Sequence, residues 1–237
     1  MINKALLATE AAKYGISLDD AALEKFDVYA QLLAQTNRQY NLTSITEPDE
    51  IVYKHFVDSL VLSVSADIDP GARVIDVGTG AGFPGIPLLI LRPDIRLTLL
   101  DSTAKKLVFI ETVLAELGLA AETLHSRAEL AARSPEYREK FDVAAARAVA
   151  ALPVLSEYCL PFLKLGGRFI AMKSRGADEE ICSAEGAIGI LGGKIAEIKR
   201  FEIENCGSRT LIITKKISQT PPKYPRASAQ ISKKPLA

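Results

Sequence analysis

Hydrophobic and polar residues change their spacing along this chain, and the change divides it into regions. From Val74 onward, short apolar runs of strand length alternate with longer segments that repeat apolar residues at helical spacing. The pattern predicts strands at 73–77, 96–100, 120–125, 141–146 and 168–172, and helices at about 85–91, 103–117, 151–163 and 177–190. Repeated strand–helix–strand units favour a mostly parallel sheet with right-handed crossovers.

The two ends of the chain have other patterns. Apolar residues recur at helical spacing from Leu23 to Leu33, and we expect residues 1–65 to be helical and to form a cap on the sheet. After the last helix, β segments at 194–203 and 209–215 flank Asn205-Cys206-Gly207, which predicts an antiparallel hairpin at the end of the sheet.

The net charge of the 237 residues is zero, but the charges are unevenly distributed. After Glu204 the chain has seven basic side chains and no acidic one. A second basic group consists of Lys164, Arg168, Lys173 and Arg175. Such asymmetry is typical of contact with a polyanion, and a solvated tail is the alternative. Residues 218–237 are rich in Pro, Ser and Lys and are expected to be extended or weakly ordered. The predicted units are a helical cap (1–65), a central domain (66–217) and a basic tail (218–237).

Three glycines at alternate positions come after the first predicted strand. Gly78, Gly80 and Gly82 lie at the end of this apolar run, and a segment suited to a helix comes next. Glycine lacks Cβ, so the backbone here can approach a ligand closely, and a helix N-terminus beside it favours a nucleoside-bearing cofactor. The stretch from Gly80 to Gly85 also matches the dinucleotide pattern G-x-G-x-x-G, which is a weak signal in isolation.

Two acidic residues bear on which cofactor fits this loop. Asp76 lies at the end of the strand, where a carboxylate would repel a pyrophosphate but can accept a hydrogen bond from an ammonium group. This favours S-adenosylmethionine over NAD, with a tight turn that binds no ligand as a third alternative. Asp101 ends the second strand, and a carboxylate there suits the ribose hydroxyls of either cofactor.

Further candidate residues lie at the carboxyl ends of strands, where open parallel sheets bind their ligands. Ser102 comes after the second strand, Ala128 and Glu129 after the third, and Arg147 after the fourth. An acid or a backbone amide after the third strand is well placed to contact the adenine edge, and an arginine can hold a carboxylate or phosphate through two hydrogen bonds. The alternatives are a surface charge for Glu129 and a structural ion pair with Asp101 or Glu129 for Arg147.

Several protein classes are disfavoured by what the sequence lacks. The chain has two histidines and three widely spaced cysteines without a C-x-x-C pair, so we expect no metal site. No apolar run approaches the ~20 residues of a membrane span, and the N-terminus does not resemble a signal peptide. We therefore expect a cytoplasmic protein that does not contact a membrane.

The residues after the fourth strand limit the chemistry of a methyl acceptor. Enzymes that methylate exocyclic amino groups commonly carry Asn- or Asp-Pro-Pro-aromatic there, and this chain has Arg147-Ala-Val-Ala. Transfer to cytosine C5 needs a cysteine nucleophile, and Cys159, Cys182 and Cys206 lie outside the flanking loops. An acceptor with a free lone pair, such as guanine N7, remains. It needs alignment and exclusion of water but no general base, so we expect no catalytic base.

Several motifs together resemble the RsmG (GidB) family of bacterial small-subunit ribosomal RNA guanine-N7 methyltransferases. They are Asp76-Val-Gly-Thr-Gly-Ala-Gly-Phe-Pro-Gly-Ile-Pro, Asn41-Leu-Thr-Ser-Ile, His55-Phe-Val-Asp58-Ser-Leu, Leu100-Asp-Ser, Arg127-Ala-Glu129, Ala146-Arg147-Ala-Val-Ala, Gly166-Gly167, Arg209-Thr-Leu-Ile-Ile, Pro222-Lys-Tyr-Pro-Arg226 and Lys234-Pro-Leu236. The resemblance implies a Rossmann-like class I S-adenosylmethionine-dependent methyltransferase fold, and methylation of guanine N7 in the decoding-region loop of 16S ribosomal RNA. The substrate would be this RNA or the 30S particle, and we expect a monomer.

The resemblance also implies roles for individual residues. Those expected to contact S-adenosylmethionine are Gly78, Phe83, Ala128, Glu129 and Arg147, with Asp101 on the ribose. Their positions at the strand ends add Asp76, Gly80, Gly82 and Ser102 to the expected cofactor site. Charge and placement, rather than the resemblance, predict the residues that contact RNA around the cofactor mouth: Arg38, Asn41, His55, Lys173, Arg175, Arg209, Lys223, Tyr224 and Arg226.

Some of these roles have structural alternatives. His55 and Arg147 are candidates for orienting the acceptor, but His55 can instead pair with Asp58 on one helix face. Tyr224 can stack on a base or anchor the tail, and Phe83 can pack on adenine or fill the core. A small-molecule methyltransferase, a non-catalytic S-adenosylmethionine-binding protein associated with RNA, and a nicotinamide dehydrogenase are the other functional classes.

Overall fold

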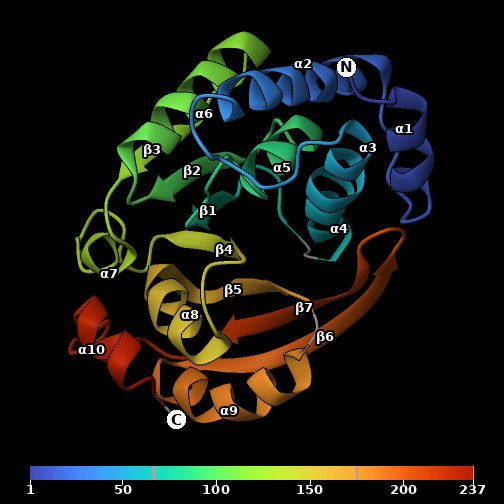
Figure 1. Ribbon diagram of the computed structural model, residues 1–237. Coiled ribbons are helices and arrows are strands. Elements are labelled where there is room, and N and C mark those ends of the chain that lie inside the picture. Colours follow the sequence, from blue (N-terminus) through green and yellow to red (C-terminus); the bar gives the residue numbers. More distant parts are fainter. Residues whose placement is uncertain (66–67, 175, 237) are drawn as a thin grey trace.

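The computed structural model of the protein describes residues 1–65, 68–174 and 176–236 and is organised around a seven-stranded sheet (Figure 1). The strand order is β3-β2-β1-β4-β5-β7-β6. The first five strands in this order, from β3 through β1 to β5, pair in parallel with their neighbours. Strand β7 runs antiparallel to both β5 and β6. The strands span Arg73–Val77 (β1), Arg96–Asp101 (β2), Glu122–His125 (β3), Phe141–Arg147 (β4), Leu163–Lys173 (β5), Gly193–Ile203 (β6) and Gly207–Lys216 (β7). The predicted mostly parallel sheet with a C-terminal antiparallel hairpin is confirmed.

Helices cover both faces of the sheet, above and below it in Figure 1. On the upper face lie Lys4–Ala12 (α1), Asp20–Asn37 (α2), Pro48–Ile51 (α3), the π-helix Val52–Val57 (η1), Asp58–Ser65 (α4), Gly85–Leu91 (α5) and Ala104–Leu117 (α6). The later helices are Ala128–Ala131 (α7), Leu152–Cys159 (α8), the 3₁₀ turn Leu160–Phe162 (η2), Ala177–Ile190 (α9) and Ser228–Lys233 (α10).

The two faces bury separate sets of side chains, because successive residues of a strand point to opposite faces. In β1, Val74 packs under the N-terminal helices, whereas Ile75 and Val77 pack with α8 and α9. Phe26 and Tyr29 of α2 are fully buried in the same core as Val74. The helices of residues 1–65 therefore share their hydrophobic core with the first face of the sheet.

The helix expected at 151–163 is shorter in the structure. It ends at Cys159 and passes through η2, and Leu163 already pairs with Phe141 as the first residue of β5. Pro161 accounts for the break, because it has no N–H and cannot extend an α-helical hydrogen-bond ladder. As a result β5 starts at Leu163 rather than at 168.

The C-terminal segment is held against the body of the protein, and the expectation of extended or weakly ordered chain is wrong for 228–233, which form α10. Arginines from the segment after α7 donate to its carbonyl oxygens: Arg138 Nη1 to Tyr224 O (2.9 Å) and Arg133 Nε to Pro225 O (2.8 Å). The Arg226 guanidinium pairs with Glu157 of α8, whose side chain is fully buried. Proline and lysine content gives no sign of these long-range partners.

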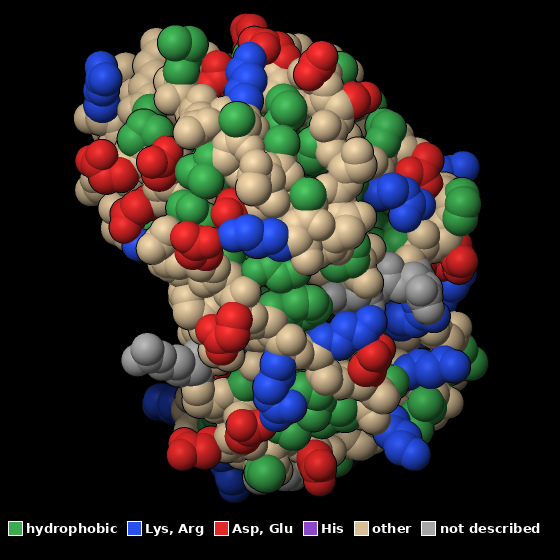
Figure 2. All heavy atoms as spheres, turned by 90° about the vertical axis from the view of Figure 1, so that its right-hand side faces the viewer, with side chains coloured by type: hydrophobic (Ala, Val, Ile, Leu, Met, Phe, Trp, Pro, Cys, Tyr) green, Lys and Arg blue, Asp and Glu red, His purple; other side chains and the backbone are tan. Residues whose placement is uncertain are grey.

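The surface turned toward the viewer in Figure 2 carries both signs of charge. Lys and Arg side chains gather in the lower right part of this view, at the height of the C-terminal strands and α9, with fewer acidic side chains among them. Among the described residues, no helix is long and apolar enough to cross a membrane. No cluster of three or more His, Cys, Asp or Glu side chains in the described part of the chain is arranged to hold a metal ion.

Candidate functional site

The glycine loop connects β1 to α5 and exposes its backbone to a cavity. Gly78 and Gly80 have φ angles of +73° and +63°, which side-chain-bearing residues rarely adopt. The amides of Gly78 and Thr79 donate to Leu100 O at 2.8 and 3.0 Å, which fixes the loop to β2. A Cβ on Gly78 would lie 2.8 Å from Val149 Cγ2. Glycine at this position therefore allows the loops after β1 and β4 to approach each other.

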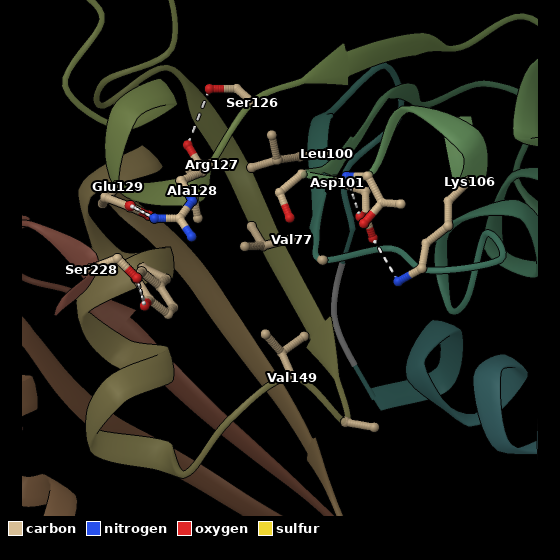
Figure 3. A pocket seen from close by; sticks show the side chains of 15 residues that line it. Val77, Leu100, Asp101, Lys106, Ser126, Arg127, Ala128, Glu129, Val149 and Ser228 are labelled. Carbon is tan, nitrogen blue, oxygen red and sulfur yellow. Dashed lines mark hydrogen bonds and ion pairs between the residues drawn. The ribbon is translucent and has the colours of Figure 1, made fainter. Parts of the chain in front are cut away.

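A cavity of about 350 Å³, here named the first cavity, opens at the carboxyl ends of β1, β2 and β3 (Figure 3). It is lined by Val77, Gly78, Leu100, Asp101, Ser102, Thr103, Lys106, Ser126, Arg127, Ala128, Glu129, Ala148, Val149, Tyr158 and Ser228. The expected strand ends therefore do converge, and five of the expected cofactor residues line this space: Gly78, Asp101, Ser102, Ala128 and Glu129.

Asp101 forms one end of the first cavity and also organises the loops around it. Its Oδ2 accepts from the Gly80 amide at 3.0 Å and lies 3.6 Å from Lys106 Nζ, while Oδ1 accepts from the Thr103 amide at 2.9 Å. The side chain is largely buried. One carboxylate thus joins the glycine loop to the start of α6 and still faces the cavity.

The other end of the first cavity includes a residue that the sequence did not indicate. Ser228 of α10 reaches the cavity wall, and its Oγ lies 3.1 Å from the Tyr158 hydroxyl of α8 (Figure 3). Glu129 lies nearby in the same view, 3.7 Å from Arg127. The C-terminal segment therefore builds part of this wall. No local motif signals it, because the contact spans 70 residues.

Asp76 is buried behind the glycine loop and does not line the first cavity. Its Oδ2 accepts from Thr79 Oγ1 at 2.7 Å and from the Gly85 amide at 2.8 Å. Its Oδ1 is buried without a hydrogen-bond partner among the described residues. Burial raises the pKa of Asp76 to about 6, although the bonds from Thr79 and Gly85 favour the ionised form. A buried acceptor of this kind remains available to a donor brought by a ligand.

Gly82 and Phe83 face the N-terminal helices rather than the first cavity. A Cβ on Gly82 would lie 2.7 Å from the Tyr29 hydroxyl, which donates to Ala81 O at 2.5 Å. The buried Phe83 ring stacks on Tyr29 at a centroid distance of 5.2 Å and on His55 at 4.4 Å. Of the two expectations for Phe83, packing in the core describes this position.

A second cavity, also of about 350 Å³, adjoins the first through Ala148. Its lining residues are Ile45, Lys54, His55, Asp58, Arg147, Ala148, Met172, Lys173, Ser174, Glu180 and Arg209. They come from the loop before α3, the helices η1 and α4, the ends of β4 and β5 with the residues that follow them, the start of α9, and strand β7. Asp58 joins two of these regions, because Oδ2 accepts from Arg147 Nη1 and Oδ1 accepts from Arg209 Nε, each at 2.8 Å. Arg147 therefore pairs with Asp58 rather than with Asp101 or Glu129.

His55 lies in the π-helical turn η1, a kind of helical irregularity often found at functional sites. Its Nδ1 faces Arg147 Nη2 at 3.2 Å, and its Nε2 lies 2.8 Å from Thr43 Oγ1. Because a guanidinium can only donate, Nδ1 accepts and Nε2 carries the proton. Burial and the charge of Arg147 lower the pKa of His55 to about 3, so the ring is neutral at physiological pH.

Comparison with known proteins identifies the family. A family model described as "GidB: rRNA small subunit methyltransferase G" matches residues 22–212. The chain belongs to this family. Ribosomal RNA small subunit methyltransferase G of Desulfitobacterium hafniense is 50% identical over 226 residues, which cover 94% of this chain and 93% of that relative. Its counterpart in Acetivibrio thermocellus is 47% identical over 233 residues, covering 98% and 96%.

Solved structures give the same fold at low sequence identity. An S-adenosylmethionine-dependent O-methyltransferase from Thermotoga maritima matches with a TM-score of 0.53 at 16% identity, covering 80% of this chain and 72% of that one. Precorrin-6y C5,15-methyltransferase from Geobacter metallireducens matches with a TM-score of 0.50 at 16% identity, covering 73% and 90%. The Rossmann-like methyltransferase fold expected from the motifs is confirmed. As a GidB family member, the chain is an S-adenosylmethionine-dependent methyltransferase of small-subunit ribosomal RNA.

The first cavity fits this family's cofactor on structural grounds. Asp101 offers a fixed carboxylate, and the Gly78 backbone lies at the wall without a Cβ that would meet Val149. The partnerless Oδ1 of Asp76 lies buried behind the same loop. Asp101 suits the ribose of either cofactor, whereas the buried Asp76 carboxylate favours a cofactor that brings a hydrogen-bond donor over one that brings a pyrophosphate.

The residues expected to contact RNA separate into three groups in the structure. His55, Lys173 and Arg209 come together in the second cavity, and the Lys173 ammonium pairs with Glu180 at 2.7 Å. Arg38 and Asn41 lie after the end of α2. Three residues lie in the docked C-terminal segment, namely Lys223, Tyr224 and Arg226. Arg175 lies outside the described residues.

Proposed function

We propose that this enzyme methylates N7 of a guanine in the decoding-region loop of 16S ribosomal RNA, by direct in-line attack of N7 without a general base. Family membership supplies the RNA class and the cofactor. The observation that supports the acceptor chemistry is the second cavity. It adjoins the first at Ala148, and both ring nitrogens of its one described histidine, His55, already contact neighbouring side chains.

The first cavity is the proposed cofactor site. When bound there, S-adenosylmethionine supplies a methyl group on a positively charged sulfur. In this proposal Asp101 accepts from the ribose hydroxyls, while Ser102, Ala128 and Glu129 contact the rest of the nucleoside. The backbone of Gly78 and Gly80 lets the cofactor lie against β1. Asp76 Oδ1 accepts a hydrogen bond from the amino acid part of the cofactor.

The second cavity is the proposed acceptor site. N7 of guanine has a lone pair in the ring plane and loses no proton before it accepts a methyl group. Two of the groups around it match this requirement, because His55 is neutral with a pKa of about 3 and both oxygens of Asp58 accept from arginines. The site then acts by holding the base in line and by excluding water.

Other acceptors fit the two cavities less well. Transfer to cytosine C5 requires a cysteine nucleophile, and none of Cys159, Cys182 and Cys206 lines either cavity. The loop after β4 has Arg147-Ala-Val-Ala in place of the Pro-Pro-aromatic arrangement typical of exocyclic amine methylation. A lone-pair acceptor remains the class that these residues serve.

For the RNA surface, we propose Arg38 and Asn41 after α2, Lys173 and Arg209 in the second cavity, and Lys223 in the C-terminal segment. Lys223 is exposed, and its Nζ lies 5.2 Å from the centre of the Tyr224 ring. The buried positions of Tyr224 and Glu157 favour an anchoring role for Tyr224 and Arg226 instead. Exposed arginines and lysines position the phosphate backbone, and they make affinity fall with salt.

Replacing the acceptor atom tests this proposal. A 16S RNA carrying 7-deazaguanosine at the modified position keeps every hydrogen-bonding group of guanine except N7. We expect this RNA to bind with unchanged affinity and to accept no methyl group. Transfer to the 7-deaza substrate at the rate of normal RNA would contradict the proposed acceptor atom, and transfer to another base would contradict the proposed target.

A further inference from the structure

The second cavity contains two carboxylates among its described lining residues, and their partners differ. Asp58 is buried, and each of its oxygens already accepts from an arginine at 2.8 Å. Glu180 lies in the first turn of α9, and its side chain is 30% exposed. An acceptor base that enters the cavity can therefore reach an oxygen of Glu180 more readily than one of Asp58.

The Glu180 carboxylate is held in place through one oxygen. Oε2 accepts from the Leu152 amide at 2.6 Å and from Lys173 Nζ at 2.7 Å. Lys173 Nζ also donates to Ala150 O at 2.6 Å, so the loop after β4, the end of β5 and α9 are tied together. Oε1 takes part in none of the hydrogen bonds between described residues. A positioned carboxylate with an unused oxygen thus lines the cavity.

Guanine is the base that offers neighbouring donors to such a group. Its N1–H and N2–H₂ lie side by side on the Watson–Crick edge, and a carboxylate can accept from both. Adenine has an acceptor at N1, so the same carboxylate would repel it. N7 lies on the opposite side of the base and stays free of donors in this orientation. Methylation at N7 leaves a positive charge on the ring, which a nearby carboxylate stabilises.

We propose that Glu180 determines the specificity for guanine by accepting from N1–H and N2–H of the acceptor base in the second cavity. This assignment rests on the proposed guanine-N7 function and adds to it the group that recognises the base. The contacts of Glu180 with Lys173 and Leu152 use one carboxylate oxygen, and the proposed recognition of guanine uses the other.

Inosine at the target position provides the test, because it keeps N1–H, O6 and N7 but lacks the N2 amino group. The full-length enzyme and Glu180→Gln are each assayed on 30S particles reconstituted with guanosine or inosine at the mapped position. For the wild type we expect kcat/KM to fall roughly 10-fold on inosine, the size of one hydrogen bond to a charged acceptor. For Glu180→Gln we expect a loss of roughly 10- to 100-fold on guanosine and almost no further loss on inosine.

Glu179→Gln is the matched control, because it removes the neighbouring charge from an exposed position of α9 that does not line the cavity. It should keep the wild-type preference for guanosine. If Glu180 only supports Lys173 and the loop after β4, Glu180→Gln will slow both substrates by one factor and keep the guanosine-to-inosine ratio, which would overturn the proposal. Equal rates of the wild type on both substrates would overturn it as well. Mapping the wild-type product at N7 separately decides whether the underlying function holds.

Discussion

Removing the Arg226 side chain should destabilise the protein and weaken its cofactor site. The Glu157 side chain is fully buried, and it accepts from Arg226 at three donors: the amide (2.7 Å), Nε (2.9 Å) and Nη2 (2.6 Å). In Arg226→Ala the guanidinium is lost and the buried carboxylate keeps only the backbone donor. Breaking a buried pair in this way costs about 3–5 kcal/mol.

Local undocking of the C-terminal segment limits how much unfolding free energy Arg226→Ala can remove. The segment that carries Arg226 can undock, which hydrates Glu157 but removes Ser228 from the wall of the first cavity. The observed loss of unfolding free energy is then the smaller of about 3–5 kcal/mol and the free energy that docks the segment. For a chain of this length each kcal/mol corresponds to ~2–4 °C, so we expect a drop of about 10 °C in Tm.

Urea unfolding and calorimetric titration with S-adenosylmethionine measure the two effects. Arg226→Ala should lower the urea midpoint and weaken cofactor binding, and Glu157→Gln in the same background should restore part of the stability by removing the buried charge. Lys223→Ala is the control, because this exposed lysine lies in the same segment and should change stability by less than about 0.5 kcal/mol. The proposed anchoring role would be wrong if Arg226→Ala kept both its urea midpoint and its cofactor affinity and lost only RNA binding.

Two further changes test the first cavity, and a third tests the buried carboxylate behind the glycine loop. Asp101→Asn should raise the Kd for S-adenosylmethionine roughly 10- to 100-fold by weakening charged hydrogen bonds, as titration calorimetry would detect, whereas an unchanged Kd would exclude Asp101 from the site. Ser228→Ala should raise the same Kd by less than about 10-fold and leave RNA affinity unchanged in a filter-binding assay. Asp76→Asn should remove a pH dependence from the unfolding free energy of the cofactor-free protein. Burial raises the pKa of Asp76 from 3.8 to about 6, so the wild type should gain stability relative to the variant as pH falls from about 6 toward 4, by up to ~3 kcal/mol. Parallel pH curves for the two proteins would contradict this last assignment.

The parts of the fold that depend on local patterning could be predicted from the sequence. The alternation of strand-length and helix-length segments after Val74 predicted the parallel sheet and its closing hairpin, because burial on both faces leaves a strong signal in each segment. The strand ends bearing Asp101, Ala128 and Glu129 do converge on one cavity, which is a consequence of parallel topology alone.

Long-range partners could not be predicted in the same way. Asp76 and Phe83 belong to the cofactor motif, but the fold buries Asp76 behind the loop and stacks Phe83 between Tyr29 and His55. The basic C-terminal segment has the composition of a solvated tail. Its docking could not be predicted, because the partners that hold it, Glu157 and two arginines, lie far away in the sequence. Ser228 could not be predicted for the same reason.

Methyl transfer to ribosomal RNA, with the modified atom mapped, is the decisive measurement for the proposed function. The purified enzyme is incubated with labelled S-adenosylmethionine and with 16S RNA or 30S particles from cells that lack it, and the modified nucleotide is located. We predict label at N7 of a single guanine in the decoding-region loop. Label on another atom or base, or tight cofactor binding without transfer to either form of the RNA, would contradict the proposed function.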